Sequence, residues 1–424
     1  MKAILDHKLK NRLVFLFFII CVALPLQAQQ TFQEFHGKVF DSETNDVLVF
    51  ATIGLKGTNI STITNAEGEF TLKVPSDTSE NTVLITSLGY QSVEVRLTEL
   101  DKGFSKIRLS PMVTQLSEVN LTAFNSAEAL VRTVFADKAK NNLREDVLMT
   151  AFYRETIKRR NRNVSLTEAV INLYKQPNNS TQKDVLELHK ARKSTDYRRL
   201  DTVAVKLQGG PFSALYIDVM KYPEYIFTDR SIGYYDFSFA APTTVNDKPV
   251  YVVQFRQKED IPPPGYQGKL YIDVESLALT SASYSLIIGN EREASELFVK
   301  KKPRDVNVIP TKASYRVDYR EKNGKWYYGY GSVQLSFKVS KRRKWFNSHY
   351  SLSSEMAVTD WETNPSGKVA LMKDRLKPTV IIADAVSGFS DPEFWGPYNV
   401  IEPEKSIESA INKIKRKLRK EKGS

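Results

Sequence analysis

The sequence is poor in the residues that build disulfide frameworks and metal centres. It has one cysteine and four histidines among 424 residues. The cysteine, Cys21, lies in an apolar run near the N-terminus, so the rest of the chain offers no disulfide and no thiolate. A zinc peptidase needs a His-x-x-Glu pair, and none of His36, His189 and His349 is followed by glutamate at that spacing. The sequence therefore predicts no metal site, no cofactor and no zinc peptidase.

Long apolar runs are also missing after the first 28 residues, and no later segment is apolar enough to cross a membrane as a helix. The N-terminus itself has basic residues up to Arg12 and an apolar run over residues 13–26, with Ala28 as a small residue for cleavage. We predict that residues 1–28 are a secretory signal, with an uncleaved membrane anchor as the alternative. A cleaved signal predicts export, to the periplasm or to the outer membrane.

The charge balance is strongly basic, with a formal net charge of +12 at pH 7. Because the chain is expected to be exported, we expect no nucleic-acid partner. Anionic lipid headgroups, acidic glycans or solubility alone explain the excess better, and the expected partner is a lipid surface or an outer-membrane protein. The hydrophobic fraction of 41% supports a packed core, and the length predicts roughly two to three domains.

Residues 34–97 have the pattern of short antiparallel strands. Apolar residues alternate with polar ones, as in Phe70, Leu72 and Val74, and glycine or asparagine stands where tight turns need it. No helical pattern interrupts the strands, which predicts an antiparallel β-sandwich. The expected strands are residues 34–40, 51–55, 68–74, 82–87 and 91–97.

Four phrases in this region carry a family resemblance: GKVFD at 37–41, ATIGLKGT at 51–58, TNAEGEF at 64–70 and SLGY at 87–90. In this order they resemble the carboxypeptidase-like regulatory domain, and LSEV at 116–119 resembles its exit in Bacteroidota envelope proteins. The resemblance covers residues 35–123 and implies a transthyretin-like β-sandwich used for binding or scaffolding. Asn65 stands where the family usually has aspartate, and both side chains accept backbone hydrogen bonds in a turn.

Beyond residue 125 the pattern changes to a helix and then to long strands. After a capping Ser126, apolar residues recur at helical spacing over residues 127–135. Strands and turns follow, including the hairpin signal Asn323-Gly324. We predict an α+β domain over residues 125–400, an antiparallel strand meander with a few helices, so the fold class is mainly β or α+β. The expected strands are residues 250–255, 269–274, 278–286, 295–300, 313–320, 326–339 and 346–358.

A second resemblance covers residues 148–155 and 167–174. They resemble uncharacterised Bacteroidota envelope proteins that join the regulatory-like domain to a domain of unknown function, which implies no assigned chemistry. Within these residues Arg154, Glu155 and Glu168 offer the guanidinium and two carboxylates of an acid/base site. A structural ion-pair cluster on neighbouring strands is the alternative.

The strand expected at residues 326–339 has aromatic side chains on one face. By strict alternation Trp326, Tyr328, Tyr330 and Gln334 share that face, and the other carries Tyr327, Val333, Leu335, Phe337 and Val339. An aromatic row beside polar groups can stack on sugar rings or line an apolar cavity. These four are therefore the candidate ligand-binding residues, with ordinary burial as the alternative.

Two basic segments are candidates for contact with anionic surfaces. The first is a run at an expected hairpin tip, Lys341, Arg342, Arg343 and Lys344. The second is a basic amphipathic helix expected within residues 403–424, with cations near its end at Lys415, Arg416 and Arg419. The alternatives are a solvated corner for the first and docking on the protein's own sheet for the second.

Together these features favour a non-enzymatic binding or scaffolding protein of the bacterial cell envelope. A carrier of a lipid or other apolar ligand in a half-barrel is a second hypothesis, because residues 272–276 resemble a reversal in periplasmic lipoprotein-carrier folds. A hydrolase that uses Glu155 and Glu168 is a third. The sequence does not specify the ligand.

Overall fold

The structure is a computed structural model that describes residues 31–100, 103–112, 124–160, 162–195, 209–262, 264–289, 291, 294–295, 305–341, 347–382, 392–405 and 407. The predicted signal at 1–28 and the motif at 116–119 lie outside these residues. So do the predicted basic contacts Arg342, Arg343, Lys344, Lys415, Arg416 and Arg419, while Lys341 is described only as the last residue of a strand. In the described part of the chain, no helix is long and apolar enough to span a membrane.

The first unit is a sandwich of a three-stranded and a four-stranded sheet. Alternate residues of the strands, such as Val39, Ile53 and Ile85, fill the core between the two sheets. Gly68 and Gly89 have the positive φ values, 74° and 81°, that their turns require. The sandwich predicted from the sequence is confirmed, although its first and last strands pair in parallel where antiparallel strands were expected. Its sheets comprise β1 (Phe32–Asp41), β4 (Glu69–Pro75) and β7 (Ser105–Leu109), and β2 (Thr52–Leu55), β3 (Ser61–Ile63), β5 (Thr82–Thr86) and β6 (Val93–Arg96).

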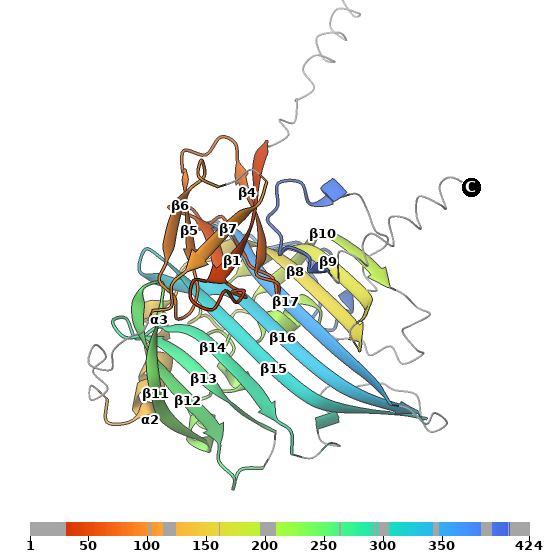
Figure 1. Cartoon of the computed structure of the whole chain (residues 1–424). Helices are drawn as coiled ribbons and strands as arrows, with labels where there is room; N and C mark the ends of the chain where they lie inside the picture. Colours follow the sequence, from red (N-terminus) through yellow and green to blue (C-terminus); the bar gives the residue numbers. More distant parts are fainter. Residues whose placement is uncertain are drawn as a thin grey trace, which may run out of the picture.

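The second unit is built on a ten-stranded antiparallel sheet, which confirms the predicted meander (Figure 1). Its order is β10-β9-β8-β17-β16-β15-β14-β13-β12-β11, so the last strand returns to pair with the first. The Asn323-Gly324 turn joins its two longest strands, as predicted. The strands are β8 (Val147–Arg159), β9 (Arg162–Lys175), β10 (Val185–Thr195), β11 (Tyr235–Val245), β12 (Lys248–Gln257), β13 (Gly265–Asp273), β14 (Leu279–Ile287), β15 (Val306–Lys322), β16 (Lys325–Lys341) and β17 (Ser348–Thr363).

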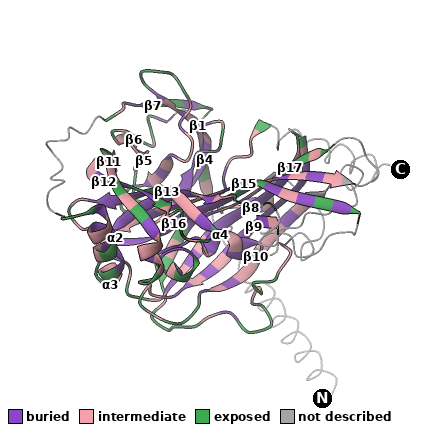
Figure 2. Ribbon diagram, turned by 90° about the horizontal axis from the view of Figure 1, so that it is seen from below, coloured by how far each residue is buried: buried purple, intermediate pink, exposed green. Residues whose placement is uncertain are grey.

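One face of this sheet, called the inner face, is covered by short helices (Figure 2). In α2 (Ala127–Ala136) the Ser126 side chain accepts a hydrogen bond from the Ala129 amide, and the predicted apolar stripe is buried. The other helices are α3 (Lys138–Asn141), α4 (Pro211–Leu215), η3 (Pro223–Tyr225) and η4 (Ser231–Tyr234). Their apolar side chains and the inner-facing strand residues form one core.

The opposite, outer face carries the sandwich and the segment of residues 392–407, which begins with η5 (Pro392–Trp395) (Figure 1). Ile63 of the sandwich packs here with Tyr330 of β16. Phe152 of β8 meets Trp395 edge to face, with ring centroids 5.4 Å apart. Three separate parts of the chain therefore meet on the outer face, and the spaces between them are where a site can form.

Candidate functional site

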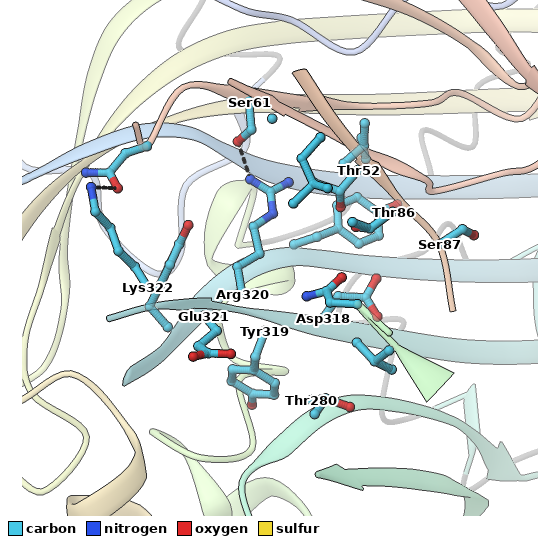
Figure 3. Close-up of a pocket in the computed structure, with 18 of the residues that line it drawn as sticks. Thr52, Ser61, Thr86, Ser87, Thr280, Asp318, Tyr319, Arg320, Glu321 and Lys322 are labelled. Atoms are coloured by element: carbon cyan, nitrogen blue, oxygen red, sulfur yellow. Dashed lines mark hydrogen bonds between the residues drawn. The ribbon is translucent and has the colours of Figure 1, made fainter. Parts of the chain in front are cut away.

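A cleft of about 360 Å³ lies between the sandwich and the outer face of the large sheet (Figure 3). Its roof comes from β2, β3 and β5, and its floor from β14, β15 and β16. This volume lies within the usual range for small-molecule sites, which often form at junctions between structural units. Its lining is rich in hydroxyl groups and charged side chains, so it is the candidate functional site.

The hydroxyl groups of the roof follow from strand alternation. Ile53 and Ile85 point into the sandwich core, so Thr52 and Thr86, which pair across β2 and β5, point the other way. Ser87 follows at the end of β5 and also lines the cleft. The side chains of Thr52, Thr86 and Ser87 make no hydrogen bond to another described residue. The roof therefore presents hydroxyl donors and acceptors that are available to a ligand.

The same alternation on β15 supplies the charges of the floor. Val317 and Tyr319 belong to the inner core, and the Tyr319 hydroxyl donates to an Asp218 oxygen at 2.9 Å. Arg316, Asp318 and Arg320 therefore face outward and line the cleft. The Arg316 guanidinium donates through Nε to Asp318 Oδ2 at 2.7 Å, so these two charges neutralise each other.

Arg320 has no such partner. Its Nη1 donates to the Ser61 hydroxyl of the sandwich and to the Val358 carbonyl oxygen, the latter at 2.8 Å. Its Nη2 is buried and has no hydrogen-bond partner among the described residues, and no described carboxylate lies within ion-pair distance. Burial lowers the pKa of Arg320, and the charges of Tyr327 and Asp318, with a side-chain hydrogen bond to Tyr327, offset this only in part. An unsatisfied buried donor on a charged group costs about 1–3 kcal/mol or more, so the cleft contains a cation with unused binding capacity.

The other charges of the cleft are mostly matched. Lys56 pairs with Glu94 at 2.6 Å, and Glu321 pairs with Lys248 at 2.7 Å. Lys322 donates to the neutral Asn59 side chain at 2.6 Å. Within the described residues, Arg320 and Lys322 are thus the cleft cations without a carboxylate partner, and the electrostatic potential of the cleft favours an anion.

Aromatic rings close one end of the cleft. Phe50 and Tyr330 both line it, with ring centroids 5.3 Å apart. The Arg316 guanidinium lies 5.0 Å from the centroid of the Phe50 ring. Burial raises the pKa of Tyr330 well above its usual value, and its hydroxyl donates to Glu355 at 3.2 Å. Tyr330 is 2% exposed, so the half-buried Phe50 ring is the apolar surface that this end presents beside the hydroxyl groups.

The prediction that four residues of β16 share one face is wrong. A bulge shifts the register so that Asp318 pairs with Tyr330 and Tyr319 with Tyr328, which leaves Gly329 unpaired. Trp326 and Tyr328 therefore turn into the inner core, where they are 2% and 1% exposed. Tyr330 faces outward into the cleft, and Gln334 is exposed on the outer face beyond it. Of the four, Tyr330 is the residue that the structure brings to the candidate site.

The two candidate catalytic glutamates do not share a pocket. Arg154 pairs in register with Glu168, so Glu155 lies on the opposite face of the sheet, where its carboxylate accepts from Tyr153 at 3.0 Å. Glu168 instead accepts from Arg154 and from Arg192, at 2.9 and 2.7 Å. The alternative interpretation, a structural ion-pair cluster, fits Glu168, and Glu355 joins Arg154 there at 3.6 Å.

The segment of residues 392–407 covers this ion-pair cluster and also bonds to the sandwich. Arg154 donates to the Glu402 carbonyl oxygen at 3.3 Å, and the Asn65 side chain donates to the same oxygen at 3.1 Å. Asn399 exchanges two hydrogen bonds with the backbone of Lys73, at 2.7 and 3.0 Å. These contacts fix the sandwich on the sheet, and so they hold the roof and floor of the cleft in place.

Sequence reasoning missed Arg320 and the hydroxyl groups of the roof. One signal was present, because Arg316, Asp318, Arg320 and Lys322 alternate on β15 with inner residues. The pairing of this row with Thr52 and Thr86 had no sequence signal, because it depends on how the sandwich docks.

A family comparison identifies the first unit. Residues 35–121 match the model of the CarboxypepD_reg-like domain family. This confirms the regulatory-like domain predicted from the four phrases. No curated protein matches the chain.

The solved structures that match include a DUF1329 family protein from Desulfovibrio piger. It is 10% identical, and the match covers 56% of this chain and 92% of that one with a TM-score of 0.23. A TM-score of this size does not establish a shared fold. Among the described residues, no group of three or more His, Cys, Asp or Glu side chains is arranged to hold a metal ion.

Proposed function

We propose that the protein is an exported, non-enzymatic binding protein of the cell envelope that holds a small polyhydroxylated molecule in the cleft between sandwich and sheet. The observation that carries this proposal is that side-chain atoms of two units, without hydrogen-bond partners among the described residues, converge on one cleft. Thr52, Thr86 and Ser87 contribute hydroxyl groups from above, and Arg320 contributes guanidinium donors from below.

Two further features support the proposal. The roof belongs to the domain that matches the CarboxypepD_reg-like family, whose name denotes a regulatory type. The roof and floor are also preorganised by the segment of residues 392–407, which reduces the entropy that a ligand would lose on ordering its site. Export is supported by the basic and then apolar N-terminus.

The carrier hypothesis is less well supported. It required Trp326 and Tyr328 to line a cavity, and both are buried in the inner core. The Tyr328 hydroxyl donates to the Ala214 carbonyl oxygen of α4 at 2.9 Å, so the helix fills the space above this ring. The described residues place an interior of packed side chains where the second hypothesis expected an apolar ligand.

A panel of three sugars with one ring and different charges tests the proposal: glucose, glucosamine and glucuronic acid. Saturation-transfer NMR on the mature protein, residues 29–424, should detect binding of at least one of them. Thr52→Tyr should abolish the signal, because its side chain would enter the cleft. Thr98→Tyr, at an exposed position outside the cleft, should leave it unchanged. Silence from all three sugars, or a signal that survives Thr52→Tyr, would overturn the proposal.

A further inference from the structure

The unused binding capacity of the cleft is concentrated on a positive charge. Arg154 and Arg316 both contact carboxylates of the chain, whereas Arg320 contacts none among the described residues. Its Nη1 is held by Ser61 and the Val358 carbonyl oxygen, which fixes the plane of the guanidinium. The second nitrogen, Nη2, is buried and has no hydrogen-bond partner among the described residues.

We infer that the ligand carries a carboxylate, and that Arg320 is the residue that recognises it. A guanidinium held in a fixed plane is suited to a planar carboxylate, because its donors match the two carboxylate oxygens. Lys322, which has no carboxylate partner in the described part of the chain, adds a second positive charge to the same cleft. This inference rests on the proposed function and names the chemical class of its ligand.

The other residues that line the cleft indicate which groups the ligand carries besides its carboxylate. The Arg320 side chain rises from the floor to Ser61 of the roof, and Thr52, Thr86 and Ser87 lie on the roof to one side of it, so a molecule bound beside the guanidinium meets hydroxyl groups there (Figure 3). Phe50, which is half-buried, offers a ring face at one end, where it packs on the fully buried Tyr330. A sugar acid, with one carboxylate on a ring of hydroxyl groups, satisfies all three parts of the lining.

The glycine of the β16 bulge shows that space around Arg320 is closely controlled. A Cβ on Gly329 would lie 2.8 Å from Cγ of Arg320, so a larger residue would push the arginine side chain from its position. The bulge thus does two things for the site, since it also turns Tyr330 toward the cleft.

Isothermal titration with glucuronic acid and its neutral amide, glucuronamide, tests the inference. Glucuronic acid should bind at least about tenfold more tightly than glucuronamide or glucose, because only the carboxylate accepts charged hydrogen bonds from the guanidinium. Arg320→Gln should weaken glucuronic acid about 10- to 100-fold and leave glucuronamide and glucose unchanged. Thr86→Val, which removes a hydroxyl without a partner in the described chain, should weaken all three sugars by a similar factor.

Arg256→Gln is the matched control. Arg256 is exposed on the same sheet, contacts Gln267 at 2.7 Å and lies outside the cleft. Arg256→Gln removes the same charge as Arg320→Gln but outside the cleft, so it should leave the affinity for all three sugars unchanged. Equal binding of acid and amide, or an Arg320→Gln variant that binds the acid normally while folded by circular dichroism, would overturn the inference and leave the proposed function standing. Absence of binding by every sugar would instead overturn both.

Discussion

Two arginines on the outer face of the sheet, the buried Arg154 and the half-buried Arg320, have opposite environments. Arg154 lies under the segment of residues 392–407 and contacts Glu168, Glu355 and two backbone carbonyl groups. Arg320 lies under the sandwich and contacts a serine hydroxyl and one carbonyl oxygen. Both side chains extend from strands of one sheet, so the difference comes from what the rest of the chain supplies to each.

Arg154 belongs to the residues that stabilise the fold, whereas Arg320 remains available to bind a ligand. The charges around Arg154 are balanced within the chain, and Glu168 is bound by two guanidiniums. Burial alone would raise the pKa of Glu168, but Arg154 and Arg192 hold it below its usual value. Arg320 keeps a donor without a partner in the described residues, which is expected of a residue whose partner is a ligand.

The same substitution at the two arginines should change the free energy of unfolding by very different amounts. Arg154→Gln should lower the free energy of unfolding by about 3–5 kcal/mol, because it leaves Glu168 and Glu355 buried with fewer opposing charges. Arg320→Gln should change it by about 1 kcal/mol or less, because the lost hydrogen bonds are offset by removal of an unpaired buried charge. Urea unfolding followed by circular dichroism and tryptophan fluorescence measures both. Equal losses at the two positions would show that Arg320 is structural too.

Loss of the contact between the segment of residues 392–407 and the sandwich should have a smaller effect on the free energy of unfolding. Asn399→Ala should lower the free energy of unfolding by about 1–3 kcal/mol, because the edge of β4 loses both hydrogen bonds at Lys73. It should also make residues 392–407 easier to cleave with a protease under native conditions.

Asn364→Ala is the control for that variant, since Asn364 bonds locally to Lys368 in an exposed turn. Its effect should be below about 1 kcal/mol. If Asn399→Ala were no worse than this control, the segment would not be what holds the sandwich on the sheet.

Much of the fold follows from local rules, and the site does not. The sandwich was predictable because Gly68 and Gly89 mark turns that only certain backbone angles allow, and Asn323-Gly324 marked the longest hairpin. The contact between Asn65 and Glu402 joins residues 337 positions apart, and no local pattern predicts it.

The bulge on β16 was a missed local signal. Two glycines, Gly329 and Gly331, stand inside the expected strand, and glycine within a strand often marks a bulge. Strict alternation placed Tyr328 and Tyr330 together, whereas the extra residue separates them onto opposite faces. The cleft depends on this one-residue irregularity and on the docking of the sandwich, so its residues could not be assembled from periodicity alone.

The smallest expected effect concerns pH, and it compares the two carboxylates that flank Arg154. Burial raises the pKa of Glu355, with Arg154 lowering it only in part, whereas Glu168 has a lowered pKa. A raised pKa in the fold means that protonation favours the native state, so Glu355 should add stability as the pH falls from neutrality toward its usual value of 4.5. Glu168 acts in the opposite sense, since its contribution is present above 4.5 and is lost as the pH falls further.

Glu355→Gln isolates the first of these contributions, because the amide resembles the protonated acid and still accepts from Tyr330. The variant should match or exceed the wild type at pH 7 by less than about 1 kcal/mol, and the difference should shrink as the pH approaches 4.5. Below that value both proteins should lose stability together, because Glu168 is intact in each. Unfolding free energies measured between pH 3.5 and 7.5 follow this directly. If the difference in unfolding free energy between the variant and the wild type instead grew as the pH fell, the ionised form of Glu355 would stabilise the fold. Both carboxylates would then be needed to balance the charge of Arg154.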